Sequence, residues 1–384
     1  MTIQADISSR LDAAQRVVIK IGSALLVDGA SGTLHDAWMK ALAEDIAALH
    51  QADKDVIIVS SGAIALGRQQ LGLGNHNLKL EENQAAAAVG QIRLAHAWQE
   101  KLGAHDLQTA QLLLTRTDTE ARRPYLNACN TLNALLKLRA VPVINENDTV
   151  ATAEIRVGDN DRLAARVAEM ASADCLVLLS DVDGLYDANP RLDADAKLIR
   201  EVTEITPEIE NMAGSTGSAH AKGGMVTKIA AAHIAVHAGC HMVITNGATL
   251  RPLTALTNGA DCTWFVSRAT PRSARKRWIL GSLKPVGTLV LDAGAVSALT
   301  TGKSLLPAGV HDVEGDFGRG DTVMLRGPDG RDLGRGLTAY SAHDARRIMG
   351  HKSSEIEDLL GYRGRDEMIH RGDLALNDQT AKSG

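Results

Sequence analysis

Short apolar runs rich in β-branched residues alternate along the first 250 residues with longer segments of helical periodicity. Apolar runs lie at residues 16–23, 56–59, 107–114, 141–144, 175–179 and 241–245, and helical spacing marks residues 36–50, 125–138, 163–168 and the alanine-rich stretch after 228. Continuous apolar runs are typical of strands buried on both faces, and helices between them are typical of parallel crossovers. The pattern therefore predicts an α/β fold around a mainly parallel sheet.

The pattern changes near residue 270. A basic run (Arg272, Arg275, Lys276 and Arg277) precedes short strand candidates separated by Gly, Asp and Pro turns, at residues 287–292, 322–325 and 333–337, and a helical stretch at 342–348. This is typical of a small, mainly β domain. We predict an α/β domain at residues 12–266, a basic linker at 267–282, a mainly β domain at 283–361 and a polar tail at 362–384.

Polar clusters follow several of the predicted strands. The run that starts at Val141 ends in Asn145–Asp148, and Gly158–Asp161 precedes the next helix; small or acidic turns also follow the strands at 60–63 and 180–184. Open α/β sheets bind ligands at the carboxyl ends of their strands. Ordinary turn chemistry is the alternative, but two dense clusters within one short span favour a ligand site.

Two lysines stand out against this background. Lys20 belongs to the first apolar run, where a buried cation needs an anionic partner, unless it snorkels from an edge strand. Lys228 follows a glycine-containing turn far along the chain. Lysines act on phosphate as point charges, and phosphoryl transfer depends mainly on positioning and charge neutralisation. The residues therefore indicate phosphoryl transfer at strand-end turns, with the acceptor left open.

Composition narrows the classes of partner. The 384 residues are 45% hydrophobic and carry a formal charge of −5, which favours neither a polyanion nor a membrane surface as partner. Four scattered cysteines without a C-x-x-C pair are typical of a reduced protein. Neither a signal peptide nor a run of membrane-spanning length is evident, so we expect a soluble, cytoplasmic protein.

Three apparent motifs fail on inspection. Thr301–Ser304 resembles the end of a P-loop, but Ser297 stands where its first glycine belongs. Gly72-Leu-Gly74 starts a dinucleotide pattern without its third glycine. His233 and His237 have metal-ligand spacing, but no glutamate of a zinc protease motif lies between them, and G-x-S-x-G is absent. We therefore expect neither a metal held by the protein's own residues nor a serine hydrolase.

The strand-end turns closely resemble those of the glutamate 5-kinases, a branch of the amino-acid kinase family. The matching stretches are Val18–Gly22, Ser61–Ala65, Val141–Asp148, Ala151–Glu154, Val157–Asp161, Asp183–Tyr186 and Gly223–Met225 with Thr227 and Lys228. The tail, with Lys276–Trp278, Ser304–Pro307 and Arg319–Asp321, resembles the PUA domain attached to many bacterial members. The resemblance implies a three-layer αβα sandwich followed by a PUA-like domain.

It also implies ATP-dependent phosphorylation of the γ-carboxylate of L-glutamate to L-glutamyl 5-phosphate, with Mg²⁺, as the first step of proline biosynthesis. A carboxylate is already ionised at neutral pH, so this reaction requires no general base. That expectation agrees with the lack of a convincing catalytic histidine.

Roles follow residue by residue from the resemblance. The implied catalytic residues are Lys20 on the ATP phosphates, Lys228 on the transferring phosphoryl group and Asp161 orienting both lysines. Ser61, Asp148 and Asn160 would bind glutamate, with Asp148 facing its ammonium. The implied ATP-binding residues are Lys20, Gly22, Ser23, Ser180, Asp181, Lys222, Gly223, Gly224, Met225, Val226, Thr227 and Lys228.

Two positions depart from the family pattern. Ala219–Lys222 stands in place of a Gly/Thr-rich run, which puts the role of Lys222 in doubt. Ser180 replaces a threonine and keeps the hydroxyl.

The resemblance further suggests a homo-oligomer (dimer or tetramer), feedback inhibition by proline and transfer of the product to a glutamyl-phosphate reductase. Two alternatives stay open: a relative of the same fold with another acceptor, and an RNA-binding protein acting through the PUA-like tail. From Arg272 onward the chain has 17 basic and 15 acidic residues, too balanced for strong binding to a phosphate backbone. RNA is the less favoured partner, and no membrane partner is expected.

Overall fold

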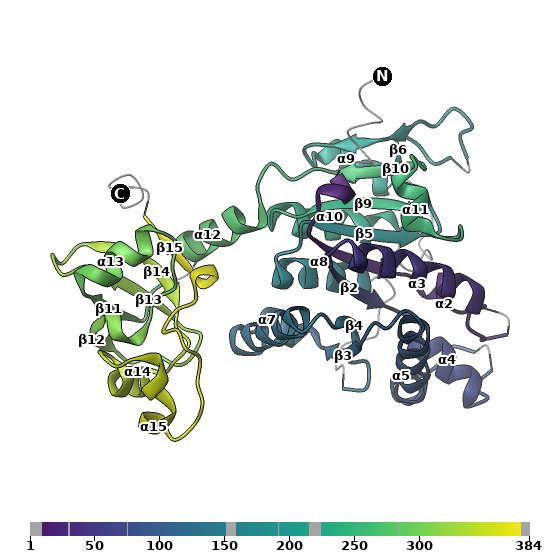
Figure 1. Ribbon diagram of the computed structural model, residues 1–384. Helices are drawn as coiled ribbons and strands as arrows, with labels where there is room; N and C mark the ends of the chain where they lie inside the picture. Colours follow the sequence, from purple (N-terminus) through teal and green to yellow (C-terminus); the bar gives the residue numbers. More distant parts are fainter. Residues whose placement is uncertain are drawn as a thin grey trace. The chain divides into compact units, whose positions relative to one another are not determined.

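The computed structural model of the chain describes residues 10–29, 31–74, 76–150, 159–190, 192–214, 224–282 and 284–377. It divides into two compact units, Met1–Pro271 and Arg272–Gly384 (Figure 1). The division falls inside the predicted basic linker, and the domain boundaries stay a prediction.

The first unit is organised around an eight-stranded sheet in the order β3-β4-β2-β1-β5-β9-β10-β8. The strands are β1 (Arg16–Ile21), β2 (Asp55–Ser60), β3 (Thr109–Leu114), β4 (Val141–Glu146), β5 (Cys175–Ser180), β8 (Glu201–Val202), β9 (His241–Asn246) and β10 (Cys262–Phe265). All neighbours run parallel except β9 and β10, which pair antiparallel. The prediction of a mainly parallel sheet is confirmed.

Strand β1 is buried on both faces of the sheet, which explains why it is apolar except for Arg16 and Lys20. Val17, Ile19 and Ile21 belong to one buried cluster, and Val18 belongs to the other. Successive side chains of a strand point to opposite faces, so Lys20 lies on the same face as Val18. Because β1 lies inside the sheet between β2 and β5, Lys20 cannot snorkel from an edge, which excludes the alternative that the sequence left open.

Helices cover both faces of this sheet (Figure 1). Its helices are α2 (Ser23–Leu26), α3 (Asp36–Gln51), α4 (Ala63–Gln70), α5 (Leu80–Gly103), α6 (Arg116–Glu120), α7 (Arg122–Lys137), α8 (Asp159–Ala171), α9 (Pro207–Gly214), α10 (Met225–His237) and α11 (Pro252–Thr257), with a small ribbon of β6 (Leu185–Tyr186) and β7 (Leu198–Ile199). Buried residues of α3, α5 and α11 join one cluster, and those of α7, α8 and α10 join the other. Lys20 therefore faces the α8–α10 layer. Within the described part of the chain, no helix combines the length and apolar character needed to cross a membrane.

The second unit has its own sheet and its own core. Five strands pair in the order β12-β11-β13-β14-β15 around a separate apolar cluster. Its elements are α12 (Pro271–Ser282), β11 (Gly287–Leu291), α13 (Ala293–Thr300), η1 (Pro307–Gly309), β12 (Val310–Gly315), β13 (Thr322–Arg326), β14 (Asp332–Leu337), α14 (Ala342–Ile348), η2 (Ser353–Glu355), α15 (Ile356–Leu360), η3 (Arg371–Asp373) and β15 (Leu374–Leu376). The prediction of a small domain built mainly on strands is confirmed.

Two segments of this unit hold more structure than their sequence suggested. The basic run is part of helix α12, and Arg275 in it bonds to Asp373 at 2.6 Å. The segment predicted as a polar tail contributes β15 to the sheet, paired with β14. In both segments, contacts with residues distant in the sequence accompany this structure.

Candidate active site

The carboxyl ends of β1, β2 and β5 meet side by side, as the sequence predicted. Ile21 pairs with Ser60 on one side and with Leu179 on the other, so the residues that follow, Ser61 and Ser180, flank Gly22. A cavity of about 1890 Å³ opens at this edge of the sheet. Residues predicted to bind glutamate and residues predicted to bind ATP both line it, including Lys20, Ser61, Asp148, Asp161, Ser180 and Lys228.

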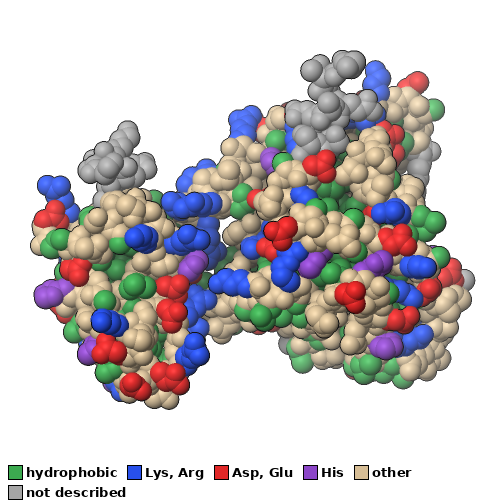
Figure 2. Space-filling view, viewed as in Figure 1, with side chains coloured by type: hydrophobic (Ala, Val, Ile, Leu, Met, Phe, Trp, Pro, Cys, Tyr) green, Lys and Arg blue, Asp and Glu red, His purple; other side chains and the backbone are tan. Residues whose placement is uncertain are grey.

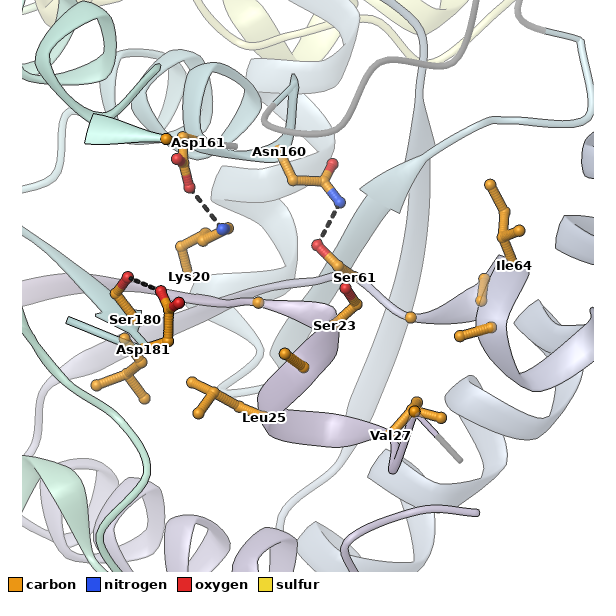
Figure 3. Close-up of a pocket in the computed structure, with 18 of the residues that line it drawn as sticks. Lys20, Ser23, Leu25, Val27, Ser61, Ile64, Asn160, Asp161, Ser180 and Asp181 are labelled. Atoms are coloured by element: carbon orange, nitrogen blue, oxygen red, sulfur yellow. Dashed lines mark hydrogen bonds and ion pairs between the residues drawn. The ribbon is translucent and has the colours of Figure 1, made fainter. Parts of the chain in front are cut away.

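A buried carboxylate joins the two lysines. Asp161, in the first turn of α8, lies 2.5 Å from Lys20 Nζ through Oδ1 and 3.5 Å from Lys228 Nζ through Oδ2. Thr227 donates its hydroxyl to Asp161 Oδ2 at 3.0 Å. All three charged side chains are buried, and Figure 3 shows Asp161 directed at Lys20 across the cavity wall. The expected anionic partner of Lys20 is therefore Asp161, although Lys20 lies within strand β1 and Lys228 within helix α10, not on turns.

Burial and charge act in opposite directions on Asp161. Burial by itself would raise the pKa of its carboxyl group, but the ammonium groups of Lys20 and Lys228, with the Thr227 hydroxyl, outweigh burial and lower the pKa below its ordinary value. The carboxylate is ionised at neutral pH. Two ammonium groups meet one carboxylate here, which suits this part of the cavity wall to an anionic phosphoryl group.

Ser61 and Asn160 form the second half of the site. Asn160 Nδ2 donates to Ser61 Oγ at 2.6 Å and to Asn145 Oδ1 at 3.2 Å (Figure 3). Ser61 is followed by Gly62, whose φ of 103° begins helix α4 in the left-handed region. Only glycine adopts that conformation readily, so Gly62 lets the chain turn sharply and leaves Ser61 at the cavity. Asp148 lies on the same wall and is 8% exposed.

Another part of the cavity wall lies beyond the end of β5. The Ser180 hydroxyl donates to Asp181 Oδ1 at 3.1 Å, and both residues line the cavity with Gly22, Ser23, Gly224 and Met225 (Figure 3). The Thr227 hydroxyl oxygen also lies 2.8 Å from the Gly224 carbonyl oxygen, at the start of α10, so its one hydrogen is shared between that oxygen and Asp161. Val226 is exposed and does not line the cavity. Lys222 and Gly223, predicted to bind ATP, lie outside the described residues, as do the resemblance stretch Ala151–Glu154 and the departure at Ala219–Lys222.

Two residues of this network were not predicted from the sequence. Asn145, the penultimate residue of β4, is almost fully buried and links Asn160 to Gln91 of helix α5. Asn145 begins the polar run after the apolar strand, which was a usable signal. Gln91 lies in an alanine-rich helix, and its neighbours in sequence give no sign of its contact.

The rejected histidine pair occupies the surface of α10. His233 Nε2 lies 2.7 Å from Glu210 Oε1, and His237 Nδ1 lies 3.1 Å from the His233 carbonyl oxygen. Among the described residues, no group of three His, Cys, Asp or Glu side chains could hold a metal ion. The described cysteines, Cys129, Cys175, Cys240 and Cys262, are all buried.

Comparison with known proteins gives matches along nearly the whole chain. The amino acid kinase family matches residues 15–246, and the PUA domain matches residues 287–360. A glutamate 5-kinase of Paramagnetospirillum magneticum is 62% identical over 368 residues, which cover 96% of this chain and 99% of the relative. A glutamate 5-kinase of Agrobacterium fabrum is 60% identical over 367 residues, covering 96% and 94%.

Proposed function

Because the chain belongs to the amino acid kinase family, we propose that it transfers the γ-phosphoryl group of ATP to the γ-carboxylate of L-glutamate, forming L-glutamyl 5-phosphate and ADP. The observation that carries this proposal is the buried Lys20–Asp161–Lys228 group at the strand ends. Relatives about 60% identical over nearly the full chain are glutamate 5-kinases, which supports glutamate as the acceptor and a place in proline biosynthesis.

The reaction needs charge stabilisation more than proton transfer. A carboxylate oxygen of glutamate attacks the γ-phosphorus while the bond to the β–γ bridging oxygen breaks, and both reactants are anions. Lys228 would stabilise the moving phosphoryl group, and Lys20 would neutralise the phosphates that remain on ADP. Asp161 fixes the positions of both ammonium groups. The pKa of its carboxyl group is lowered, so it keeps its negative charge and holds both lysines through the reaction.

Glutamate binding would use the other half of the site. The Ser61 hydroxyl accepts from Asn160, so its own hydrogen is available for a carboxylate oxygen of the substrate. Asp148 supplies the negative charge that the substrate ammonium requires. Asn160 also lines the cavity, where it donates to Ser61 and directly precedes Asp161. It would complete the contacts with glutamate.

ATP would occupy the part of the cavity lined by Ser180, Asp181, Gly224 and Met225, with its phosphates toward Lys20, Gly22 and Ser23. Lys222, Gly223, Val226 and Thr227 complete the proposed ATP-binding residues. Val226 is exposed, and Thr227 acts through its hydrogen bond to Asp161. A role for Lys222 and Gly223 rests on the resemblance alone.

Mg²⁺ fits this site as an ion carried by the nucleotide. Mg²⁺ commonly keeps several waters and binds substrate phosphates with only one or two carboxylates. The described residues offer no cluster that would hold an ion by itself, while Asp181 lines the ATP part of the cavity and would supply a carboxylate to the ion or its waters. The ion would neutralise negative charge on the phosphates.

The direct test is acceptor-dependent ATP turnover by the full chain with Mg²⁺. L-Glutamate, L-aspartate and N-acetylglutamate are compared, and acyl phosphate is trapped with hydroxylamine. We expect hydroxamate from glutamate, and its loss in Lys228→Met. Lys54→Met is the matched control, because Lys54 is equally buried but donates to three backbone carbonyls away from the cavity. Turnover of another acceptor would keep the fold and refute glutamate; no turnover with any acceptor from folded protein would refute the kinase assignment.

Three further proposals rest on the resemblance: a homo-oligomer, inhibition by proline and transfer of the product to a glutamyl-phosphate reductase. Light scattering and turnover with added proline test the first two. RNA binding through the second unit is not favoured, because acidic and basic side chains are intermixed on the face of this unit that Figure 2 shows. Salt-dependent RNA binding would overturn that view.

A further inference from the structure

Two consecutive residues of helix α5, Gly90 and Gln91, pack beside the site without lining the cavity. Gly90 packs against α4 so closely that an added Cβ would lie 1.8 Å from the Ala63 carbonyl oxygen, directly after the Ser61–Gly62 turn. The next residue, Gln91, is 8% exposed and accepts a hydrogen bond from Asn145 Nδ2 at 2.8 Å. This close packing brings Gln91 within reach of the end of β4.

The direction of each hydrogen bond in this network can be assigned from one backbone group, the Glu146 N–H. The Glu146 N–H can only donate, and it donates to Asn145 Oδ1 at 2.9 Å. Oδ1 of Asn145 also accepts from Asn160 Nδ2, so the Asn145 amide nitrogen must point the other way, at Gln91 Oε1. With its nitrogen facing Asn145, Asn160 donates its second hydrogen to Ser61 Oγ. The Ser61 hydroxyl is thereby left to donate its own hydrogen elsewhere.

We propose that Gln91 is a positioning residue that keeps Ser61 a hydrogen-bond donor, and so makes the site selective for a carboxylate-bearing acceptor. Asn145 is 3% exposed, and a buried amide nitrogen without an acceptor is costly. Gln91 supplies that acceptor and holds the Asn145 amide in the orientation that the network requires. Without it, the Asn145 amide can turn, Asn160 loses its acceptor, and Ser61 can present a lone pair to the substrate carboxylate. This inference rests on the proposed function, because it concerns binding of the glutamate acceptor.

Two substitutions separate this role from packing. Gln91→Met keeps the length of the side chain and removes the acceptor oxygen. Gln91→Glu keeps an acceptor oxygen whether its carboxyl group is ionised or protonated. We expect Gln91→Met to raise the KM for glutamate about 10-fold, the scale of one hydrogen bond to a charged group. The KM for ATP should stay within about twofold, and Gln91→Glu should lie nearer to the wild-type enzyme than to Gln91→Met.

The kinetics are measured on the full chain with glutamate and ATP varied in turn, alongside thermal unfolding. An unchanged glutamate KM in Gln91→Met overturns the inference, and so does an equal rise in both variants, since the acceptor oxygen would then be irrelevant. A parallel rise in both KM values with a lower Tm would mean a purely structural role. A wild-type enzyme without glutamate turnover refutes the proposed function itself, and the inference with it.

A double variant covers the case in which Gln91→Met does not fold. Its instability would come from the unpaired Asn145 nitrogen, and Asn145→Ala removes that nitrogen. In the Asn145→Ala background, Gln91→Met should therefore fold and leave the glutamate KM unchanged, because the connection to Asn160 is already broken. A further severalfold rise in that background would overturn the inference.

Discussion

Replacing Asp161 by asparagine tests the central group of the site without changing its shape. Asp161 is 1% exposed and contacts Lys20 at 2.5 Å, Lys228 at 3.5 Å and Thr227 at 3.0 Å. An amide leaves two buried ammonium groups without their anion. Removing one partner of a buried ion pair costs about 3–5 kcal/mol, and about 2–4 °C of Tm corresponds to each kcal/mol in a domain of this size. We expect the Tm of the first unit to fall by about 6–20 °C.

The turnover of Asp161→Asn should fall further than its loss of folded protein explains. The two ammonium groups repel each other once the carboxylate is gone, and misplacement by about 1 Å can reduce a rate about 100-fold. We therefore expect kcat of folded Asp161→Asn to fall at least about 100-fold, measured by hydroxamate formation at a temperature well below its Tm.

Asp45→Asn is the matched control for this variant. Asp45, in α3, is also almost fully buried and accepts from Arg251 Nε at 3.1 Å and from the Leu253 and Thr254 N–H groups at 2.9 and 3.2 Å, away from the cavity. We expect Asp45→Asn to lose stability and to keep kcat. Equal losses of kcat in the two variants would show that Asp161 acts only through folding, and an Asp161→Asn enzyme with wild-type stability and kcat would refute the reasoning.

The pH dependence of unfolding provides a second check on Asp161. The pKa of this carboxyl group is lowered in the folded protein from an ordinary value of 3.8. A lowered pKa means that ionised Asp161 stabilises the fold fully above about pH 3.8, and that this contribution is lost as the pH falls through the folded pKa. The difference in unfolding free energy between wild type and Asp161→Asn, from urea titrations, should be constant near neutral pH and shrink below pH 3.8. A difference that does not shrink there would contradict the lowered pKa.

Three further predictions concern neighbouring residues. Ser61→Ala should raise the KM for glutamate about 10-fold or more and leave the KM for ATP unchanged, because one hydrogen bond to a charged group is lost; steady-state kinetics with each substrate varied would show otherwise. Gly90→Ala should destabilise the chain by about 1–3 kcal/mol in urea unfolding, because its Cβ would lie 1.8 Å from the Ala63 carbonyl oxygen, while Gly103→Ala in the same helix meets open space and should not destabilise it. Lys20→Met should abolish turnover but cost less stability than Asp161→Asn, because Asp161 keeps its contact with Lys228; a Tm as low as that of Asp161→Asn would contradict this.

The strands and the edge that carries the site could be predicted because they depend on local patterns. Continuous apolar runs gave β1, β2, β4, β5 and β9 to within a residue or two. Long helix α5 was missed, because its alanines and scattered polar residues give little amphipathic contrast. Segments β12, β15 and α12 depend on pairing with distant parts of the second unit, which local sequence does not contain.

Contacts within the site likewise divide into those that local sequence predicts and those that depend on tertiary packing. That Lys20 requires an anion follows from its place in a buried strand, but the choice of Asp161 depends on how α8 packs across β1, some 140 residues later in the chain. The motif resemblance brought Lys20, Asp161 and Lys228 together as a catalytic set, and the distances between them agree with that grouping. Physical reasoning from the residues alone reached phosphoryl transfer at the strand ends and left the acceptor open.

Gln91 shows why a hydrogen-bond network is harder to read from sequence than an ion pair. The charge of a buried lysine indicates that an anionic partner must lie nearby. A glutamine in a helix gives no such indication, because it carries no charge that requires a partner. Its importance arises because Asn145 directs its amide oxygen at the Glu146 N–H and its amide nitrogen at Gln91, so that an acceptor is necessary at that one point. Residues of this kind determine the direction in which a site donates hydrogen bonds, and so which acceptors it admits, while carrying neither a charge nor a motif of their own. The comparison of Gln91→Met with Gln91→Glu isolates that contribution, since the two side chains differ chiefly in whether they offer an acceptor oxygen to Asn145.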